Sequence, residues 1–98
     1  MHARSGRGKV PPDRIDDAVA RLNEQLPRYR EAQGYKGFTC LVDRQRGAVL
    51  GVSFWESEAD RDASENLGTQ ARQTIVEAAG GQEELEREAW EVAIDDTA

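Results

Sequence analysis

Cysteine and histidine, the residues that most often reinforce a small domain through disulfides and metal sites, are almost missing from this sequence. Its 98 residues include one cysteine and one histidine, which excludes an internal disulfide and leaves no Cys/His cluster for a structural metal. A chain of this length buries only about 60–68% of its unfolded surface, so its own core is thin. Association with another chain is therefore the expected source of further stability.

Long hydrophobic runs are missing as well. No segment approaches the ~18–20 apolar residues of a membrane-spanning helix, and the basic residues 1–9 are not followed by the apolar stretch of a signal peptide. Acidic residues outnumber basic ones by 19 to 13, which gives a net charge of −6. This balance argues against general nucleic-acid binding, which depends on neutralising phosphates. A soluble cytoplasmic protein is expected.

The charge is unevenly distributed along the chain. Residues 1–47 carry 10 basic and 6 acidic side chains, whereas residues 48–98 carry 3 basic and 13 acidic ones. The simplest interpretation is two solvated faces of one domain. The alternative is electrostatic complementarity between the halves of two subunits.

An amphipathic helix is predicted after the pair Pro11-Pro12. Pro12 suits the first turn, where its missing N–H is not needed, and Gly34 suits a left-handed cap after the last turn. Pro27 removes one helical hydrogen bond and predicts a kink near the end. Apolar residues recur at spacings of four and three, which places them on one helical stripe. They are Ile15, Val19, Leu22, Leu26 and Tyr29.

The period then changes to two, which is typical of strands. Apolar residues alternate over 38–42, and the following loop 43–47 ends in Gly47, which can adopt a positive φ. A second strand is predicted over 48–56. Its two faces are both apolar, which indicates an inner strand covered on both sides, and Gly51 within it indicates a close approach of another group to the backbone.

A second helix is predicted to begin after Ser57, because Ser57-Glu58-Ala59-Asp60 resembles a capping box. Its apolar residues are small at first, at Ala59, Ala63 and Leu67, and the stripe continues after Gly68 with Ala71, Ile75, Val76 and Ala79. Gly68 within the pattern predicts a break or kink, and Gly80-Gly81 is expected to end the helix.

The segment 83–95 has the Glu- and Ala-rich composition of a helix, but the alternation from Trp90 to Ile94 favours a strand. With residues 1–9 as a first strand, the order is β-α-β-β-α-β. This order predicts a single ferredoxin-like α+β domain over 1–98, with two helices on one face of an antiparallel sheet. Because the other face has no cover within the chain, two copies are expected to pack sheet to sheet as a homodimer.

Three stretches carry a resemblance to a known family. They are the helix end Gln25-Leu26-Pro27 with Gly34-Tyr35-Lys36-Gly37-Phe38, the hairpin from Leu41 to Gly51, and Val52-Ser53-Phe54-Trp55-Glu56-Ser57-Glu58. Together with the element order, they resemble the antibiotic biosynthesis monooxygenase-like group of dimeric α+β barrel proteins over nearly the whole chain. The pattern is one of fold and packing rather than a catalytic signature. It implies that Met1 to Gly8 is a genuine first strand.

The resemblance also implies a function. Members of this group bind small aromatic substrates between the sheet and the helices of each protomer, and some oxygenate them without metal or flavin. The chain is therefore expected to be a homodimeric, cofactor-independent monooxygenase-like protein that binds a small aromatic ligand, with no cofactor, metal, nucleic acid or membrane. The alternative is a non-catalytic small-ligand-binding or dimerisation module. Haem degradation is least expected, because the Asn and His positions of the haem-degrading relatives are not matched.

Five residues are candidate site residues. Trp55 matches the family's strand-end aromatic and could stack on an aromatic substrate, although a core or interface role is the alternative. Arg4 and Arg72 could hold an anionic or phenolate substrate, or form surface or dimer ion pairs. His2 could be a general base and Asn66 could hydrogen-bond a substrate oxygen, with surface positions as the alternative for both.

Two further residues are assigned structural roles. Cys40 is expected to be a small buried hydrophobic residue rather than a nucleophile, because the single histidine has no evident pairing with it. Trp90 is expected to pack on the sheet.

Overall fold

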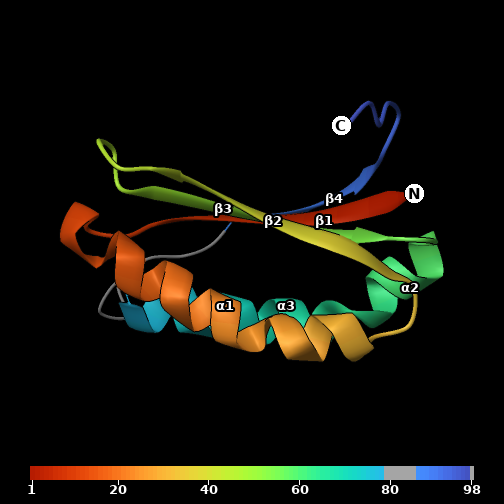
Figure 1. Ribbon diagram of the computed structural model, residues 1–98, viewed down its shortest axis with the longest axis horizontal. Coiled ribbons are helices and arrows are strands. Elements are labelled where there is room, and N and C mark those ends of the chain that lie inside the picture. The colour runs from red at the N-terminus through yellow and green to blue at the C-terminus, as the bar shows by residue number, and fades with distance from the viewer. Residues whose placement is uncertain (79–85, 98) are drawn as a thin grey trace.

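A computed structural model describes residues 1–78 and 86–97 of the chain. It contains four strands, two longer helices, one short helix and one 3-10 turn (Figure 1). In chain order these are β1 (His2–Lys9), η1 (Pro12–Arg14), α1 (Ile15–Glu31), β2 (Tyr35–Asp43), β3 (Ala48–Trp55), α2 (Glu58–Ala63), α3 (Glu65–Ala78) and β4 (Glu86–Glu91).

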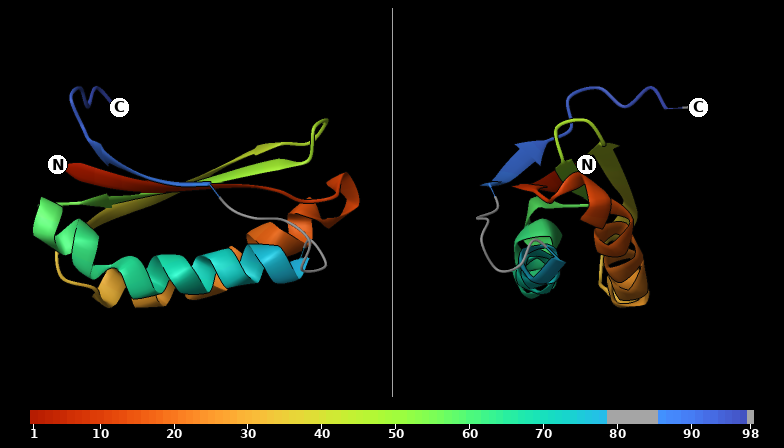
Figure 2. Two further views of the ribbon diagram at one scale, coloured as in Figure 1. Left: turned by 180° about the vertical axis from the view of Figure 1, so that it is seen from behind. Right: turned by 90° about the vertical axis from the view of Figure 1, so that its left-hand side faces the viewer.

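The strands form one sheet in the order β2-β3-β1-β4, and every neighbouring pair is antiparallel. Figures 1 and 2 show α1 and α3 side by side beneath one face of this sheet. This arrangement confirms the predicted ferredoxin-like fold. In the part of the chain that the structure describes, no helix covers the opposite face, so β3 is an inner strand that is covered on one side only.

The helix α1 forms as its apolar stripe predicts. Its buried residues Ile15, Ala18 and Leu22 join Val10 and Val49 in the core. Pro12 opens the preceding 3-10 turn, and α1 continues through Pro27 to Glu31. Removing these side chains from water stabilises the fold, because burial of a Leu or Ile side chain contributes about 1.5–3 kcal/mol.

The second helical region corrects one expectation. Ser57 caps it as predicted, since its hydroxyl accepts a hydrogen bond from the backbone N–H of Asp60 at 3.1 Å. The helix then breaks at Ser64, whose hydroxyl donates to the carbonyl of Arg61, and not at Gly68, which lies inside α3. A serine hydroxyl that bonds to a nearby carbonyl competes with helical pairing. The expected helix end at Gly80-Gly81 lies outside the described residues.

Two glycines occupy turns that no larger residue could form. Gly34 has a φ of +78° and Gly47 a φ of +69°, so both lie in the left-handed region that glycine enters without steric cost. A Cβ at position 34 would collide with the carboxylate of Asp60, and one at position 47 with the carbonyl of Val10. The first turn joins α1 to β2 and the second joins β2 to β3, as predicted.

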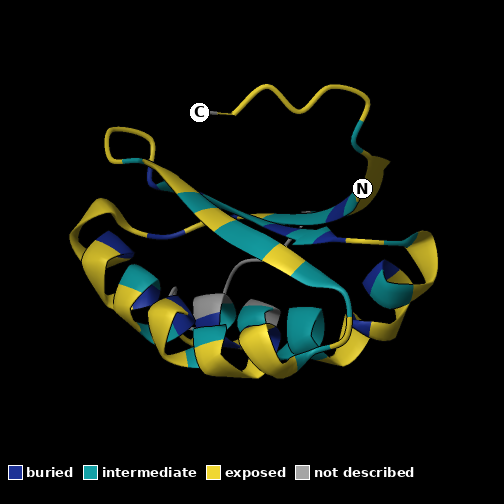
Figure 3. Ribbon diagram, turned by 45° about the vertical axis from the view of Figure 1, so that its right-hand side comes forward, coloured by how far each residue is buried: buried dark blue, intermediate teal, exposed yellow. Residues whose placement is uncertain are grey.

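The two faces of the sheet have different surroundings. On the helix-facing side of β3, Val49, Ser53 and Trp55 are buried. On the outer side, Leu41 of β2 is 54% exposed and Trp90 of β4 is 49% exposed. Figure 3 shows that the hairpin loop between β2 and β3 and the segment after β4 are also exposed.

The last strand confirms one prediction and shortens it. β4 spans Glu86–Glu91, within the predicted 83–95, and the N–H of Val92 continues the pairing by donating to the carbonyl of Met1 at 2.9 Å. Residues 83–85 lie outside the described part. None of the helices described here has both the length and the apolar character that crossing a membrane requires.

Candidate functional site

A cavity lies between the helix-facing side of the sheet and the two longer helices. The centres of water-sized spheres fit within about 40 Å³ of it, and all of its empty space, open solvent included, is about 430 Å³. The first of these volumes is well below the ~300–1,000 Å³ of pockets for drug-sized ligands. The lining residues are Arg4, Ser5, Gly6, Leu22, Tyr29, Phe38, Gly51, Ser53, Gly68, Ala71 and Arg87.

Aromatic rings form one wall of this cavity. The ring of Tyr29 on α1 lies 5.3 Å from that of Phe38 on β2, at an angle of 56°. Phe38 passes over Gly51, where a Cβ would come within 3.2 Å of its ring, so the predicted close approach at Gly51 is confirmed. Behind this wall, Trp55 lies 6.3 Å from Tyr29 and 5.9 Å from Tyr35. Tilted pairs at such distances are favourable for aromatic rings.

The Tyr29 hydroxyl remains protonated at neutral pH. Burial raises the pKa of Tyr29 to about 12, although the nearby charges of Arg4 and Arg87 act in the opposite direction. Because a buried phenol resists ionisation, Tyr29 can offer a hydrogen bond to a ligand but cannot serve as a base near pH 7.

Two arginines lie on the polar side of the cavity. In the antiparallel register of β1 and β4, Arg4 is opposite Ala89 and Gly6 is opposite Arg87, so the two arginines are diagonal neighbours on the same sheet face. The Nε of Arg4 and one terminal nitrogen of Arg87 are buried and have no hydrogen-bond partner among the described residues. Both side chains line the cavity.

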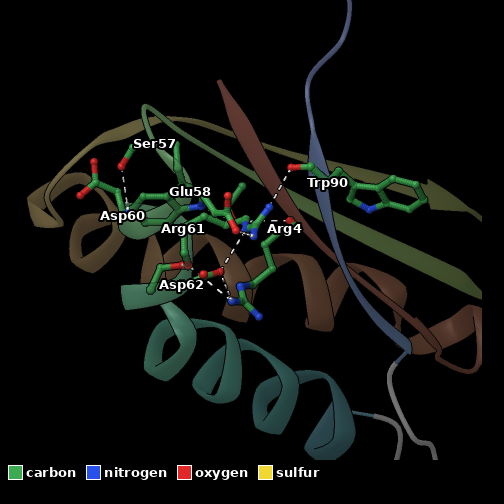
Figure 4. A network of polar contacts seen from close by, with 10 residues as sticks. Arg4, Ser57, Glu58, Asp60, Arg61, Asp62 and Trp90 are labelled. Carbon is green, nitrogen blue, oxygen red and sulfur yellow. Dashed lines mark hydrogen bonds and ion pairs between the residues drawn. The ribbon is translucent and has the colours of Figure 1, made fainter.

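The helix α2 holds Arg4 from one side (Figure 4). A terminal nitrogen of Arg4 donates to the carbonyl of Arg61 at 3.4 Å and lies 3.9 Å from the Asp62 carboxylate. Arg61 in turn donates to the carbonyl of Trp90 at 3.1 Å and to Asp62 at 3.1 Å. These contacts attach α2 to β1 and β4, next to the mouth of the cavity.

A second chain of hydrogen bonds runs through the buried side of the sheet. The indole N–H of Trp55 donates to the Ser53 hydroxyl at 2.9 Å, and that hydroxyl donates to the carbonyl of Arg4 at 3.4 Å. Trp55 therefore orients Ser53, which lines the cavity, and links the core to the strand that carries Arg4.

The structure brings only part of the predicted site together. Arg4 lines the cavity, whereas Trp55 is completely buried behind it, and His2 and Asn66 are not among the lining residues. His2 lies on β1 opposite Trp55 and Glu91, and Asn66 is exposed on α3. Arg72 belongs to α3, but its side chain lies outside the described part of the structure.

Sequence reasoning missed Tyr29, Ser53, Gly68 and Arg87 as site residues. Tyr29 was assigned to the helix stripe and Gly68 to a break in the helix. Arg87 falls on the strand face opposite Trp90, and the structure shows that this face looks toward the helices; the apolar alternation from Trp90 to Ile94 points the other face inward, so the sequence offers no signal for Arg87. A charged residue at an inward position of a strand is uncommon unless it is paired or functional.

The two residues assigned structural roles lie on opposite faces. Cys40 packs against the core and is half-buried, and this burial raises the pKa of its thiol. Trp90 packs on the outer face, where its indole N–H donates to Ser5 at 2.8 Å. Among the residues described, no group of three or more His, Cys, Asp or Glu side chains could hold a metal ion.

Comparison with known proteins shows relatives whose roles are not established. No protein-family model matches the chain. The uncharacterized protein Rv2557 of Mycobacterium tuberculosis is 31% identical over 94 residues, which are 95% of this chain and 41% of that protein. The uncharacterized protein Rv2558 of the same organism is 29% identical over 96 residues, 96% of this chain and 39% of that protein. The chain therefore spans about two fifths of the length of these curated relatives.

The structural neighbours include antibiotic biosynthesis monooxygenase proteins with the dimeric α+β barrel fold. A Deinococcus radiodurans protein provisionally assigned to that group superposes with a TM-score of 0.74 at 17% identity, over 100% of this chain and 98% of that chain. SnoaB, a cofactor-independent oxygenase from Streptomyces nogalater, gives a TM-score of 0.62 at 14% identity, over 99% and 97% of the two chains. The resemblance seen in the sequence is thus confirmed for the fold.

The same comparison separates fold from activity. A de novo designed protein, Foldit4, superposes with a TM-score of 0.71 at 13% identity, over 93% of this chain and 97% of that chain. Because a designed chain matches as well as the natural ones, the fold by itself carries no activity. A functional assignment has to come from the cavity.

Proposed function

We propose that this chain binds a small aromatic molecule in the cavity between its sheet and its helices. The observation that carries the proposal is the lining itself: aromatic and aliphatic side chains on one wall, and a few polar groups converging from β1, β3 and β4 on the other. Such a combination of apolar walls and few oriented polar groups is typical of small-molecule sites. Structural neighbours of this fold include a cofactor-independent oxygenase.

Ligand binding requires the cavity to widen. Its volume of about 40 Å³ is far below the ~300–1,000 Å³ of pockets for drug-sized ligands. Among the described side chains, α3 contributes the small residues Gly68 and Ala71 to the cavity lining. A small outward shift of this helix would widen the cavity beside these two residues.

Oxygenation of the bound molecule is the second candidate function, and the structural likeness to SnoaB favours it. In such a reaction a phenol takes up O₂, one oxygen atom enters the ring to give a quinone, and the other leaves as water. Electron transfer to O₂ is easier from the ionised phenol. The described lining residues include no carboxylate or imidazole, so we propose that the cavity promotes ionisation through its cations instead of a base.

Homodimerisation through the outer sheet face is part of the same proposal. Leu41 is 54% exposed and Trp90 49% exposed there, beside the half-buried Leu50, Val52 and Phe54. An apolar surface of this kind on a four-stranded sheet is expected to be covered by a partner, and proteins of this fold typically dimerise. The uneven charge of the two halves of the chain could add to the association.

The binding proposal can be tested with 1,5-dihydroxynaphthalene as the probe. We expect saturable NMR shifts of the backbone amides of Gly51 and Gly68. Ala71→Phe, which fills the cavity, should abolish these shifts, whereas Ala20→Phe on the exposed side of α1 should retain them. Equal binding by both variants would contradict the proposal.

Oxygenation is measured separately with the same probe. Oxygen uptake and quinone formation above the rate without protein, lost in Ala71→Phe and kept in Ala20→Phe, would support it. Binding without any excess uptake would reject oxygenation and leave a ligand-binding protein.

A further inference from the structure

We infer that the preferred ligand of this cavity is an aromatic carboxylate, whose charged group lies between Arg4 and Arg87. This inference rests on the proposed function, because it names the substrate class of the same cavity. The two guanidinium groups come from neighbouring strands and face the same space between sheet and helices.

These arginines have hydrogen-bond donors that the described structure does not use. The Nε of Arg4 and a terminal nitrogen of Arg87 are shielded from solvent and donate to no acceptor among the described residues. Buried donors are almost always paired in folded proteins, and an unpaired charged donor is especially unfavourable. Two carboxylate oxygens supply the two missing acceptors, one for each arginine.

The positive charge beside the cavity has few carboxylate partners among the described residues. Arg87 forms no ion pair in the described part of the chain, and the single carboxylate near Arg4 is that of Asp62, 3.9 Å away and 56% exposed. Asp62 is also shared with Arg61, which has Glu58 as a further partner at 3.7 Å. The positive charge on the cavity side is therefore only partly compensated within the described structure.

Gly68 of α3 lies against both arginine side chains. A Cβ at Gly68 would lie 3.1 Å from the terminal nitrogen of Arg87 and 3.5 Å from Cδ of Arg4. Glycine inside a helix is unfavourable relative to alanine, yet here it gives both arginines room between the sheet and α3. The packing of α3 thus preserves the space that the two guanidinium groups occupy.

The apolar lining of the cavity fits the aromatic ring of the proposed ligand. Opposite the arginines the cavity offers the rings of Tyr29 and Phe38 and the aliphatic side chain of Leu22. The charges of both arginines lower the pKa of Tyr29, against the larger effect of burial, so the two cations lie near the Tyr29 hydroxyl. The protonated Tyr29 hydroxyl can add a hydrogen bond to the same anion. A flat ring with a carboxylate matches the apolar wall with one end and the arginines with the other.

The test compares two probes of nearly equal shape by isothermal titration calorimetry, 2-naphthoate and its neutral analogue 2-naphthamide. We expect the native chain to bind 2-naphthoate at least 10-fold more tightly than 2-naphthamide. Arg87→Gln should remove most of this preference by weakening 2-naphthoate binding. The matched control is Arg30→Gln on the exposed end of α1, which removes the same charge and should keep the preference.

The outcomes separate this inference from the proposed function. Equal binding of both probes by the native chain would overturn the carboxylate inference and leave the cavity as an aromatic site. Binding of neither probe would overturn both. Thermal unfolding of Arg87→Gln accompanies the titration, and Arg4→Gln serves as a second variant if the first fails to fold. A preference that survives in both variants would also overturn the inference.

Discussion

The two faces of the sheet differ in how far their side chains are buried and in the kinds of residue they carry. The helix-facing side buries Trp55 and Val49 completely, yet it also carries the two cavity arginines. The outer side carries the half-exposed apolar residues Leu41 and Trp90, together with the charged Arg7 and Glu88 of β1 and β4. The covered face of this small sheet therefore combines core and candidate site, and the uncovered face is the one through which the proposed dimer would form. Because successive strand residues point to opposite faces, this 98-residue chain can place different kinds of side chain on the two faces of one sheet.

The largest difference between the faces should appear when their tryptophans are truncated. Trp55→Ala removes a fully buried ring that contacts Tyr29 and Tyr35 and holds Ser53, and we expect a loss of about 3–5 kcal/mol in the free energy of unfolding. Trp90→Ala, on the outer face, should cost about 1 kcal/mol or less in the monomer. Urea denaturation at low protein concentration measures both. Similar losses would mean that the faces are equally buried in solution.

A charge introduced on the outer face should weaken the proposed dimer. Leu41→Lys places a cation on the exposed apolar surface, and a two-fold interface would meet it twice. We expect the dimer dissociation constant to rise at least about 100-fold, or about 2.7 kcal/mol. Sedimentation velocity reports the mass, and binding of 1,5-dihydroxynaphthalene should be unchanged. A native chain that is already a monomer at micromolar concentration would remove the proposed dimer.

High pH should weaken the inner face through Tyr29. Its pKa is about 12 in the folded protein against 10.0 for an ordinary tyrosine, so the unfolded chain releases this proton first. The contribution of Tyr29 is complete below pH 10 and is lost as the pH rises from 10 to 12, by about 2 kcal/mol, since one pKa unit corresponds to about 1.4 kcal/mol. Urea unfolding at pH 8 and 11.5 tests this. Tyr29→Phe should lose less stability over that interval, and an equal loss would contradict the assignment.

The elements were predictable wherever packing demands apolar residues. The α1 stripe and the helix-facing side of β3 follow from burial, and Gly34 and Gly47 follow from turn geometry. β1 gave no such signal from its own residues, because its inward positions hold Arg4 and glycines rather than apolar side chains. Its strand assignment came from the family resemblance.

The site was harder to predict for the same reason. The inward arginines that obscure β1 and β4 as strands are the residues that define the cavity. Arg87 belongs to it only because the β1–β4 register brings it beside Arg4, and a single sequence does not show which strands become neighbours. The break at Ser64 rather than Gly68 has a similar origin: a glycine was interpreted by its backbone freedom, whereas the structure uses its missing side chain.

The smallest expected effect is also the one that best separates stability from binding. Gly68→Ala should stabilise α3 by up to about 1 kcal/mol, because alanine is the better helix former. The new methyl group would lie 3.1 Å from the terminal nitrogen of Arg87, and the flexible guanidinium can move away at little cost to the fold. That movement should weaken 2-naphthoate binding several-fold while 2-naphthamide binding changes little. Thermal unfolding and calorimetry on one preparation measure both quantities. A variant that is less stable and binds both probes as before would show that Gly68 is required for packing and does not serve the arginines.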